Sequence, residues 1–218
     1  MKINKGTVNS SPFVGVFLVV TEKITLMPPN IMQKEELKIK KTFDTEFIKT
    51  KLADSTLLGV LCSGIDDRLV VSELALDSEI EYLESIGIKV KRIEGATAIG
   101  NLIRANRKGG VASMVLTKKQ INEIEDFLGV KFYQTKIASL DIVGSSVLAS
   151  DSCFIVNPAV TPKEFEVLKK AFGVEGTAVT LNYGDKFVGN NAVMNSCGAL
   201  LGDKTTTYEL LRIQDVLG

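Results

Sequence analysis

The sequence predicts an α/β fold of the α+β kind, built from five similar units that close into a ring around a pseudo-fivefold axis. Three observations predict it. Glycines recur at nearly constant spacing, an apolar strand-like stretch follows each of them, and helix start and stop signals repeat in the same register. We call these glycines the anchor glycines; they are Gly15, Gly59, Gly100, Gly144 and Gly189.

The repeats predict one domain over residues 1–218, because no linker rich in proline or serine separates the units. Each unit is expected to run strand, turn, strand, helix, strand. In the third unit these elements are predicted at 101–105, 106–110, 111–116, 118–128 and 130–138. The approximate unit boundaries are 9–53, 54–94, 95–138, 139–181, and 182–218 joined by 1–8.

Helix boundaries are marked by capping residues. A threonine followed three residues later by glutamine or glutamate is a capping box, in which the two side chains satisfy free backbone N–H groups at the helix start. The predicted pairs are Thr117 with Gln120, Thr161 with Glu164, and Thr206 with Glu209. A left-handed residue, usually glycine, is expected just past each helix. These residues are Asp44, Gly87, Gly129, Gly173 and Gly218.

Ring closure is predicted from a missing strand in the fifth unit and a spare strand at the start of the chain. The fifth unit stops at its helix without a last strand, whereas residues 1–8 form a strand-like segment that belongs to no unit. Pairing these residues with the fifth unit would close the ring and remove exposed sheet edges. Helices are then expected outside and strands inside.

Composition excludes several classes of function. The 26 Lys and Arg residues balance 26 Asp and Glu residues, so the chain lacks the basic excess of a dedicated nucleic-acid binder, and no DNA partner is expected. There is no histidine, which removes the Ser–His and Cys–His pairings and the usual imidazole metal ligand. The first 51 residues are nevertheless basic. Their lysines, which form either a solvated helix face or an RNA-facing edge, include Lys34, Lys38, Lys40, Lys41, Lys49 and Lys51.

Cysteine usage favours a reducing cytoplasm. Three cysteines cannot complete a disulfide framework. The apolar run at residues 13–20 lacks the flanks of a signal peptide and is too short to cross a bilayer, so no membrane partner is expected.

A closed ring of five such units is the pentein architecture, which includes enzymes that modify guanidines through a nucleophilic cysteine and a histidine. Such an enzyme acting through Cys62, Cys153 or Cys197 is the alternative hypothesis, and the absence of histidine argues against it. Residues 95–100 have the glycine spacing of a phosphate loop, but Asn101 replaces its lysine. We interpret Asp66, Asp67 and Asp151 as isolated, solvated carboxylates in turns. These expectations leave no catalytic residue, cofactor or metal.

Four motifs resemble one family, the translation initiation factor 6 family. They are Ala-Ile-Gly-Asn-Leu at 98–102, Val-Gly-Ser-Ser-Val at 143–147, Asn-Pro at 157–158 and Thr-Thr-Thr-Tyr-Glu-Leu-Leu at 205–211. The resemblance covers the whole chain. Two departures are Arg-Leu-Val-Val-Ser at 68–72, where the family usually has Gly-Leu-Leu-Val-Pro, and an aspartate before the last helix that stands one place early, at Asp203. The chain ends at Gly218 without the long tail of eukaryotic members, which indicates the archaeal type.

The resemblance implies a non-enzymatic, monomeric initiation factor of protein biosynthesis. It would bind the large ribosomal subunit, through its proteins and also rRNA, and sterically prevent association with the small subunit. A part in large-subunit biogenesis, or an assembly role without anti-association, stays open. The ribosome-binding residues that the resemblance implies lie at and after the anchor glycines and are Val60, Gly100, Asn101, Ser145 and Asn190.

Overall fold

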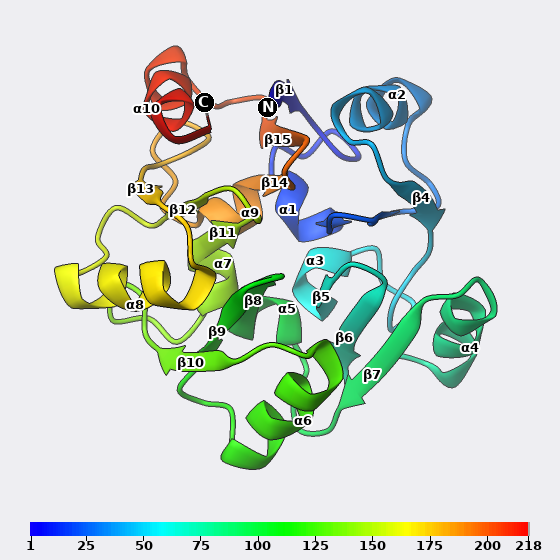
Figure 1. The fold of residues 1–218 in the computed structure, drawn as a ribbon. Helices are drawn as coiled ribbons and strands as arrows, with labels where there is room; N and C mark the ends of the chain where they lie inside the picture. The colour runs from blue at the N-terminus through cyan, green and yellow to red at the C-terminus, as the bar shows by residue number, and fades with distance from the viewer. Residues whose placement is uncertain (218) are drawn as a thin grey trace.

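The computed structural model describes residues 1–217, with side chains described through Gln214. It repeats one unit five times: a four-residue helix, two strands, a long helix and a third strand (Figure 1). The four-residue helices are α1 (Val14–Phe17), α3 (Leu58–Leu61), α5 (Ile99–Leu102), α7 (Val143–Ser146) and α9 (Val188–Asn191). The long helices are α2 (Gln33–Thr42), α4 (Asp77–Ser85), α6 (Lys118–Leu128), α8 (Pro162–Phe172) and α10 (Thr207–Leu217).

Every unit has a three-stranded sheet of the same topology. Its middle strand pairs antiparallel with the first strand and parallel with the outer strand, which follows the long helix in units one to four. The first strands are β2 (Val19–Val20), β5 (Cys62–Ile65), β8 (Ile103–Asn106), β11 (Val147–Ala149) and β14 (Ala192–Met194). The middle strands are β3 (Ile24–Met27), β6 (Arg68–Ser72), β9 (Gly109–Ser113), β12 (Phe154–Val156) and β15 (Gly198–Gly202). The outer strands are β4 (Glu46–Lys49), β7 (Lys89–Ile93), β10 (Phe132–Thr135), β13 (Gly176–Ala178) and β1 (Lys2–Gly6).

The predicted ring closure is confirmed. Strand β1 supplies the outer strand of the fifth sheet, and its register on β15 runs from Lys2 opposite Gly198 to Gly6 opposite Gly202. The Lys2 N–H also donates to the Cys197 carbonyl oxygen at 3.0 Å. The fifth unit is therefore assembled from segments near both ends of the chain, with β1 beside β15 (Figure 1).

The ring has two layers around its axis. The five long helices lie on the outer rim, and the four-residue helices surround the centre (Figure 1). Each short helix contacts the next one, and α9 contacts α1 in turn. This arrangement confirms the predicted fold, with helices outside and strands closer to the axis.

The hydrophobic core is shared between neighbouring units. One cluster joins Ile24 and Leu26 of the first sheet to Leu58 and Leu69 of the second unit and to Leu83 on α4. Corresponding clusters occupy the other interfaces. Because each unit completes its apolar surface on a neighbour, no unit is expected to fold alone.

The helix start signals behave as predicted. The hydroxyl oxygens of Thr117 and Thr161 accept from the backbone N–H groups three residues on, each at 3.3 Å, and Thr206 does so from Glu209 at 3.2 Å. At the helix ends, Gly129 and Gly173 are left-handed, with φ of 77° and 61°.

Two sequence expectations about local structure are wrong. The strand predicted at 101–105 begins only at Ile103, because the anchor glycine lies in the short helix α5. Helix α2 ends at an extended Phe43 with φ of −110°, and Asp44 does not take up the left-handed conformation, since the chain passes directly into β4. The predicted stop at Gly218 lies outside the described residues. The departure at 68–72 forms strand β6, which is paired on both sides.

A glutamate in the first turn of four long helices also binds the turn that precedes its own unit. In each of these turns two consecutive residues have positive φ. Glu209 accepts from the backbone N–H groups of Tyr183 at 3.2 Å and Gly184 at 2.8 Å, as well as from its own helix start. Glu35, Glu79 and Glu164 make equivalent bonds. We call this arrangement the carboxylate clamp, which ties the turn at the start of four of the five units to the long helix of that unit.

Candidate functional site

The anchor glycines pack against one another around the axis. A Cβ atom on Gly100 would overlap the carbonyl oxygen of Gly59, and one on Gly144 would overlap that of Gly100. The same relation closes the circle from Gly15 to Gly189. Side chains are therefore excluded at these positions, and the close packing fixes the short helices relative to each other.

One end of the ring is formed by residues that flank the anchor glycines. We call it the crown face, and it combines the residue two places before each anchor with the residue one place after it. Residues three apart lie on the same side of a helix, so both sets share one end of the molecule. The first set is Phe13, Leu57, Ala98, Ile142 and Phe187, and the second is Val16, Val60, Asn101, Ser145 and Asn190.

Four of the five expected ribosome-binding residues belong to the crown face by its definition. Val60, Asn101 and Asn190 are half-buried, whereas Ser145 is 3% exposed. The Ser145 hydroxyl donates to Oδ1 of Asn101 at 2.9 Å, so these two residues of neighbouring units act together. Gly100 is buried and has a packing role at the axis.

Three apolar residues of the crown face were not singled out from the sequence. Phe13, Leu57 and Ile142 are 41%, 39% and 37% exposed. Their signal in the sequence is their shared register, two residues before an anchor glycine. Exposed apolar side chains grouped on one face mark an interaction surface.

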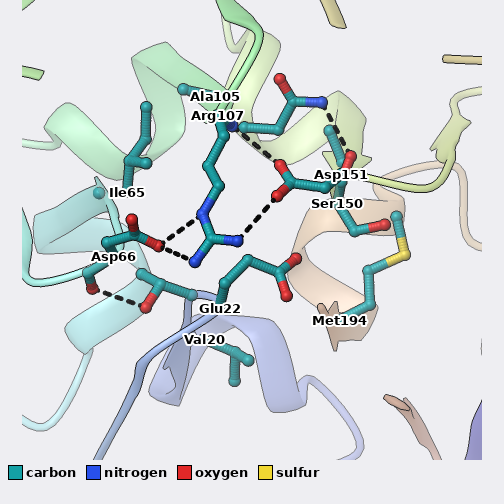
Figure 2. Close-up of a pocket in the computed structure, with 13 residues that line it drawn as sticks. Val20, Glu22, Ile65, Asp66, Ala105, Arg107, Ser150, Asp151 and Met194 are labelled. Atoms are coloured by element: carbon teal, nitrogen blue, oxygen red, sulfur yellow. Dashed lines mark hydrogen bonds and ion pairs between the residues drawn. The ribbon is translucent and has the colours of Figure 1, made fainter. Parts of the chain in front are cut away.

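The opposite end of the axis carries a charged cluster (Figure 2). The guanidinium of Arg107 lies between two aspartates, with Nε to Oδ1 of Asp66 at 2.8 Å and Nη1 to Oδ2 of Asp151 at 3.5 Å. The hydrogen bond that Arg107 donates to Asp66 raises the pKa of Arg107, and Glu22 adds a further negative charge nearby. The interpretation of these aspartates as isolated is wrong, because each stands seven residues after its anchor, in the hairpin turn of a different unit.

The axial cavity between Glu22, Arg107 and Asp151 is too small for a substrate. Its volume is about 20 Å³, which is room for a water molecule. The surrounding turns bond to one another across units: the Thr21 hydroxyl donates to the Asp66 carbonyl at 2.7 Å, and the Asn106 amide donates to that of Ser150 at 2.8 Å. This end therefore stabilises the ring.

The cysteines do not form a nucleophilic site. Burial raises the pKa of the Cys62 thiol to about 12, against a small opposing effect of Arg104, and burial also raises the pKa of Cys153. Cys197 is exposed in a hairpin turn. In the described part of the chain, no cysteine lines the axial cavity. A thiol that stays protonated at neutral pH is a poor nucleophile.

Two further findings concern metals and membranes. Among the described residues, no group of three histidine, cysteine, aspartate or glutamate side chains is placed to hold a metal ion. None of the helices described for residues 1–217 is long and apolar enough to cross a membrane.

The basic segment divides between two surfaces. Lys40 and Lys49 pair with Glu36 at 2.8 and 2.7 Å, and their hydrogen bonds lower the pKa of that carboxyl group. Lys51 pairs with Asp54 at 2.8 Å. The exposed Lys34, Lys38 and Lys41 occupy the side of α2 that faces β1.

Comparison with known proteins gives a consistent result. The model of the eIF-6 family matches residues 3–216. Translation initiation factor 6 of Staphylothermus marinus is 31% identical over 98% of this chain and 96% of its own length. The factors of the same name from Thermococcus onnurineus and Pyrococcus horikoshii are 29% and 30% identical, each over 100% of this chain and 99% of its own length.

Solved structures support the fold. Apo ArgZ, an arginine dihydrolase of cyanobacteria, superposes with a TM-score of 0.53 at 13% identity, over 74% of this chain and 28% of that one. Its N-terminal domain in a substrate-bound structure gives 0.52 at 14% identity, over 75% of this chain and 67% of that one. At this level of identity the likeness concerns the pentein fold alone. The family match and the archaeal relatives together show that the chain belongs to the eIF-6 family of translation initiation factors, which are not enzymes.

Proposed function

We propose that this protein binds the large ribosomal subunit through its crown face and sterically prevents association with the small subunit. Family membership supports the partner. The observation that carries the choice of surface is the group of exposed apolar residues Phe13, Leu57 and Ile142 beside Val60 and Asn101. The charged end of the axis is instead engaged in bonds within the protein.

The mechanism is occlusion by a rigid body. The short helices are fixed by glycine packing, so little conformational freedom is lost when the crown face binds. Apolar side chains at the centre of an interface supply most of the affinity, and surrounding polar groups such as Asn101 supply orientation. A ring held on the subunit interface excludes the small subunit by its volume, without any bond being made or broken.

Sucrose-gradient sedimentation with purified subunits tests this proposal. The protein should migrate with large subunits and reduce their joining with small ones. Leu57→Asp should weaken binding by at least about tenfold, because it places a charge in an apolar interface. Leu211→Asp, at a 57% exposed position on the rim helix α10, is the matched control and should bind normally. Failure to migrate with large subunits would end the proposal.

Asn101→Arg tests the polar part of the crown face. The substitution adds bulk at a half-buried position and removes the acceptor of the Ser145 hydroxyl, at a cost of about 1 kcal/mol. Subunit binding should fall while the melting temperature changes by only a few degrees. Unchanged affinity would remove Asn101 from the interface.

The same experiment separates two biological roles. Binding without any effect on joining would favour a role in large-subunit biogenesis over anti-association.

We also propose that the protein is a monomer in the cytoplasm. The three free cysteines support the reducing compartment. Light scattering at working concentrations should give the mass of one chain.

A further inference from the structure

Three lysines form a basic stripe along the rim helix α2. Lys34, Lys38 and Lys41 are exposed, and their spacing of four and three residues places them on one side of the helix. Within the described residues, none of their ammonium groups lies within 4.0 Å of a carboxylate, in contrast to Lys40 on the neighbouring side. The stripe therefore keeps its full positive charge.

The stripe lines a groove between α2 and strand β1. The groove has a volume of about 530 Å³ and is lined by Asn4, Gln33, Lys34, Leu37, Lys38 and Lys41. Its walls are fixed to each other, because Nζ of Lys38 donates to the Lys5 carbonyl at 2.8 Å and the Asn4 amide donates to the Thr42 hydroxyl at 3.0 Å.

Carboxylates lie only at one end of this region. A smaller hollow next to the groove shares Lys34 and Lys38 and also touches Glu35 and Asp203. Glu35 is already engaged, since it accepts from the Thr7 hydroxyl at 2.6 Å and from the backbone of Asn9 at 2.8 Å. The groove itself thus presents three cations and two amides to a ligand.

The lining chemistry selects the class of ligand. Cations and amides bind phosphate oxygens, whereas the groove offers Leu37 as its single apolar contact and has no aromatic side chain for base stacking. An acidic protein segment would need apolar anchors of the kind that the crown face supplies. We propose that the α2 groove binds the phosphate backbone of RNA, without reading its sequence.

The groove and the crown face are separate surfaces. Helix α2 lies on the outer rim, whereas the short helices surround the axis (Figure 1). This inference rests on the proposed function, because a large ribosomal subunit bound at the crown face would present its RNA close to the rim of the ring. The apolar face would then supply affinity, and the basic rim would supply orientation and faster association.

Fluorescence anisotropy with a labelled RNA duplex tests the groove in the full-length protein. Binding should weaken as salt rises from about 50 to 200 mM, since each neutralised phosphate releases a counterion. The triple variant Lys34→Gln, Lys38→Gln, Lys41→Gln should lower the slope of log Kd against log salt by about 2 to 3 and raise Kd about tenfold or more.

The matched control removes the same charge elsewhere. Lys118→Gln, Lys119→Gln, Lys163→Gln changes exposed lysines at the starts of α6 and α8 and should leave RNA binding within about twofold of wild type. An equal loss in both variants would overturn the proposal, because net charge alone would then explain binding. Wild-type protein that does not bind the duplex at low salt would overturn it as well. Preference for a polyglutamate peptide over the duplex would replace RNA with an acidic protein.

Failure of the groove can be distinguished from failure of the proposed function. Leu57→Asp should keep the affinity for the RNA duplex while losing the large subunit. If wild-type protein binds the duplex through the three lysines but does not sediment with large subunits, the groove stands and the proposed function falls. The reverse pattern leaves the proposed function intact and refutes the groove.

Discussion

Replacing Glu209 by glutamine tests the carboxylate clamp. Glu209 is 4% exposed, and each of its oxygens accepts at least two hydrogen bonds. Oε1 binds the Thr180 hydroxyl and the Gly184 N–H, both at 2.8 Å. Oε2 binds the N–H groups of Tyr183 at 3.2 Å and Thr206 at 2.8 Å. A glutamine amide has one acceptor oxygen. Its NH₂ group therefore faces either two backbone N–H groups, or one N–H group and the Thr180 hydroxyl, which can rotate to accept.

The expected cost follows from the one or two bonds that are lost. Hydrogen bonds to a charged group contribute about 1.5 to 3 kcal/mol each, so Glu209→Gln should reduce the free energy of unfolding by about 1.5 to 6 kcal/mol. For a chain of this size the melting temperature should fall by about 10 °C. The third unit shows the complementary case, in which Gln120 donates to the Glu94 carbonyl at 2.7 Å and an amide is the suitable group.

Urea and thermal denaturation provide the measurement. Glu166→Gln removes the same charge from an exposed position of α8 and should change stability by no more than about 0.5 kcal/mol. If Glu209→Gln is as stable as this control, the clamp does not contribute to stability as argued.

Three further predictions concern acid, packing and thiols. Burial would raise the pKa values of Glu164 and Glu209, but hydrogen bonds to the clamp lower both below the usual range. The two ionised carboxylates therefore stabilise the fold above about pH 4.5, and this contribution is lost as the pH falls through their pKa values in the folded protein. A melting temperature that does not change between about pH 5 and pH 3 would contradict this. Gly100→Ala should lower the free energy of unfolding in urea by about 3 kcal/mol or more, because the added methyl group meets the carbonyl oxygens of Gly59 and Cys62. Asn101→Ala, measured in the same way, should lower it much less. In native protein a thiol reagent should modify Cys197 rapidly, and Cys62 and Cys153 only on unfolding; fast reaction of all three would show that the ring opens.

Repeat register, capping and ring closure could be predicted because each has a local chemical signature. Thr117 with Gln120 can bond only at a helix start, and Gly129 suits a left-handed residue whatever lies around it. Ring closure could be predicted because the fifth unit lacks its last strand and residues 1–8 form a strand that belongs to no other unit. The recurrence of the anchor glycines every 41 to 45 residues reflects a steric requirement at the axis, where each glycine packs against the next.

Other features depend on the assembled ring and could not be predicted residue by residue. A four-residue helix such as α5 is too short to show helical periodicity, so the sequence predicts the start of a strand there. Pairing of Arg107 with Asp66 and Asp151 joins three hairpin turns that are far apart in the sequence. The exposure of Leu57 likewise depends on the assembled ring, since the next residue, Leu58, is fully buried.

Pairing of β1 with β15 has a consequence for the timing of folding during synthesis. Strand β1 is made before the other strands of the ring, yet its partner β15 is the last strand to be made. Until β15 is made, strand β1 has no partner and the ring cannot close. Each nascent chain therefore carries an incomplete ring. Contacts between such distant segments also form slowly. A chain that ends before β15 therefore cannot close the ring, and nothing holds its crown positions in one circle.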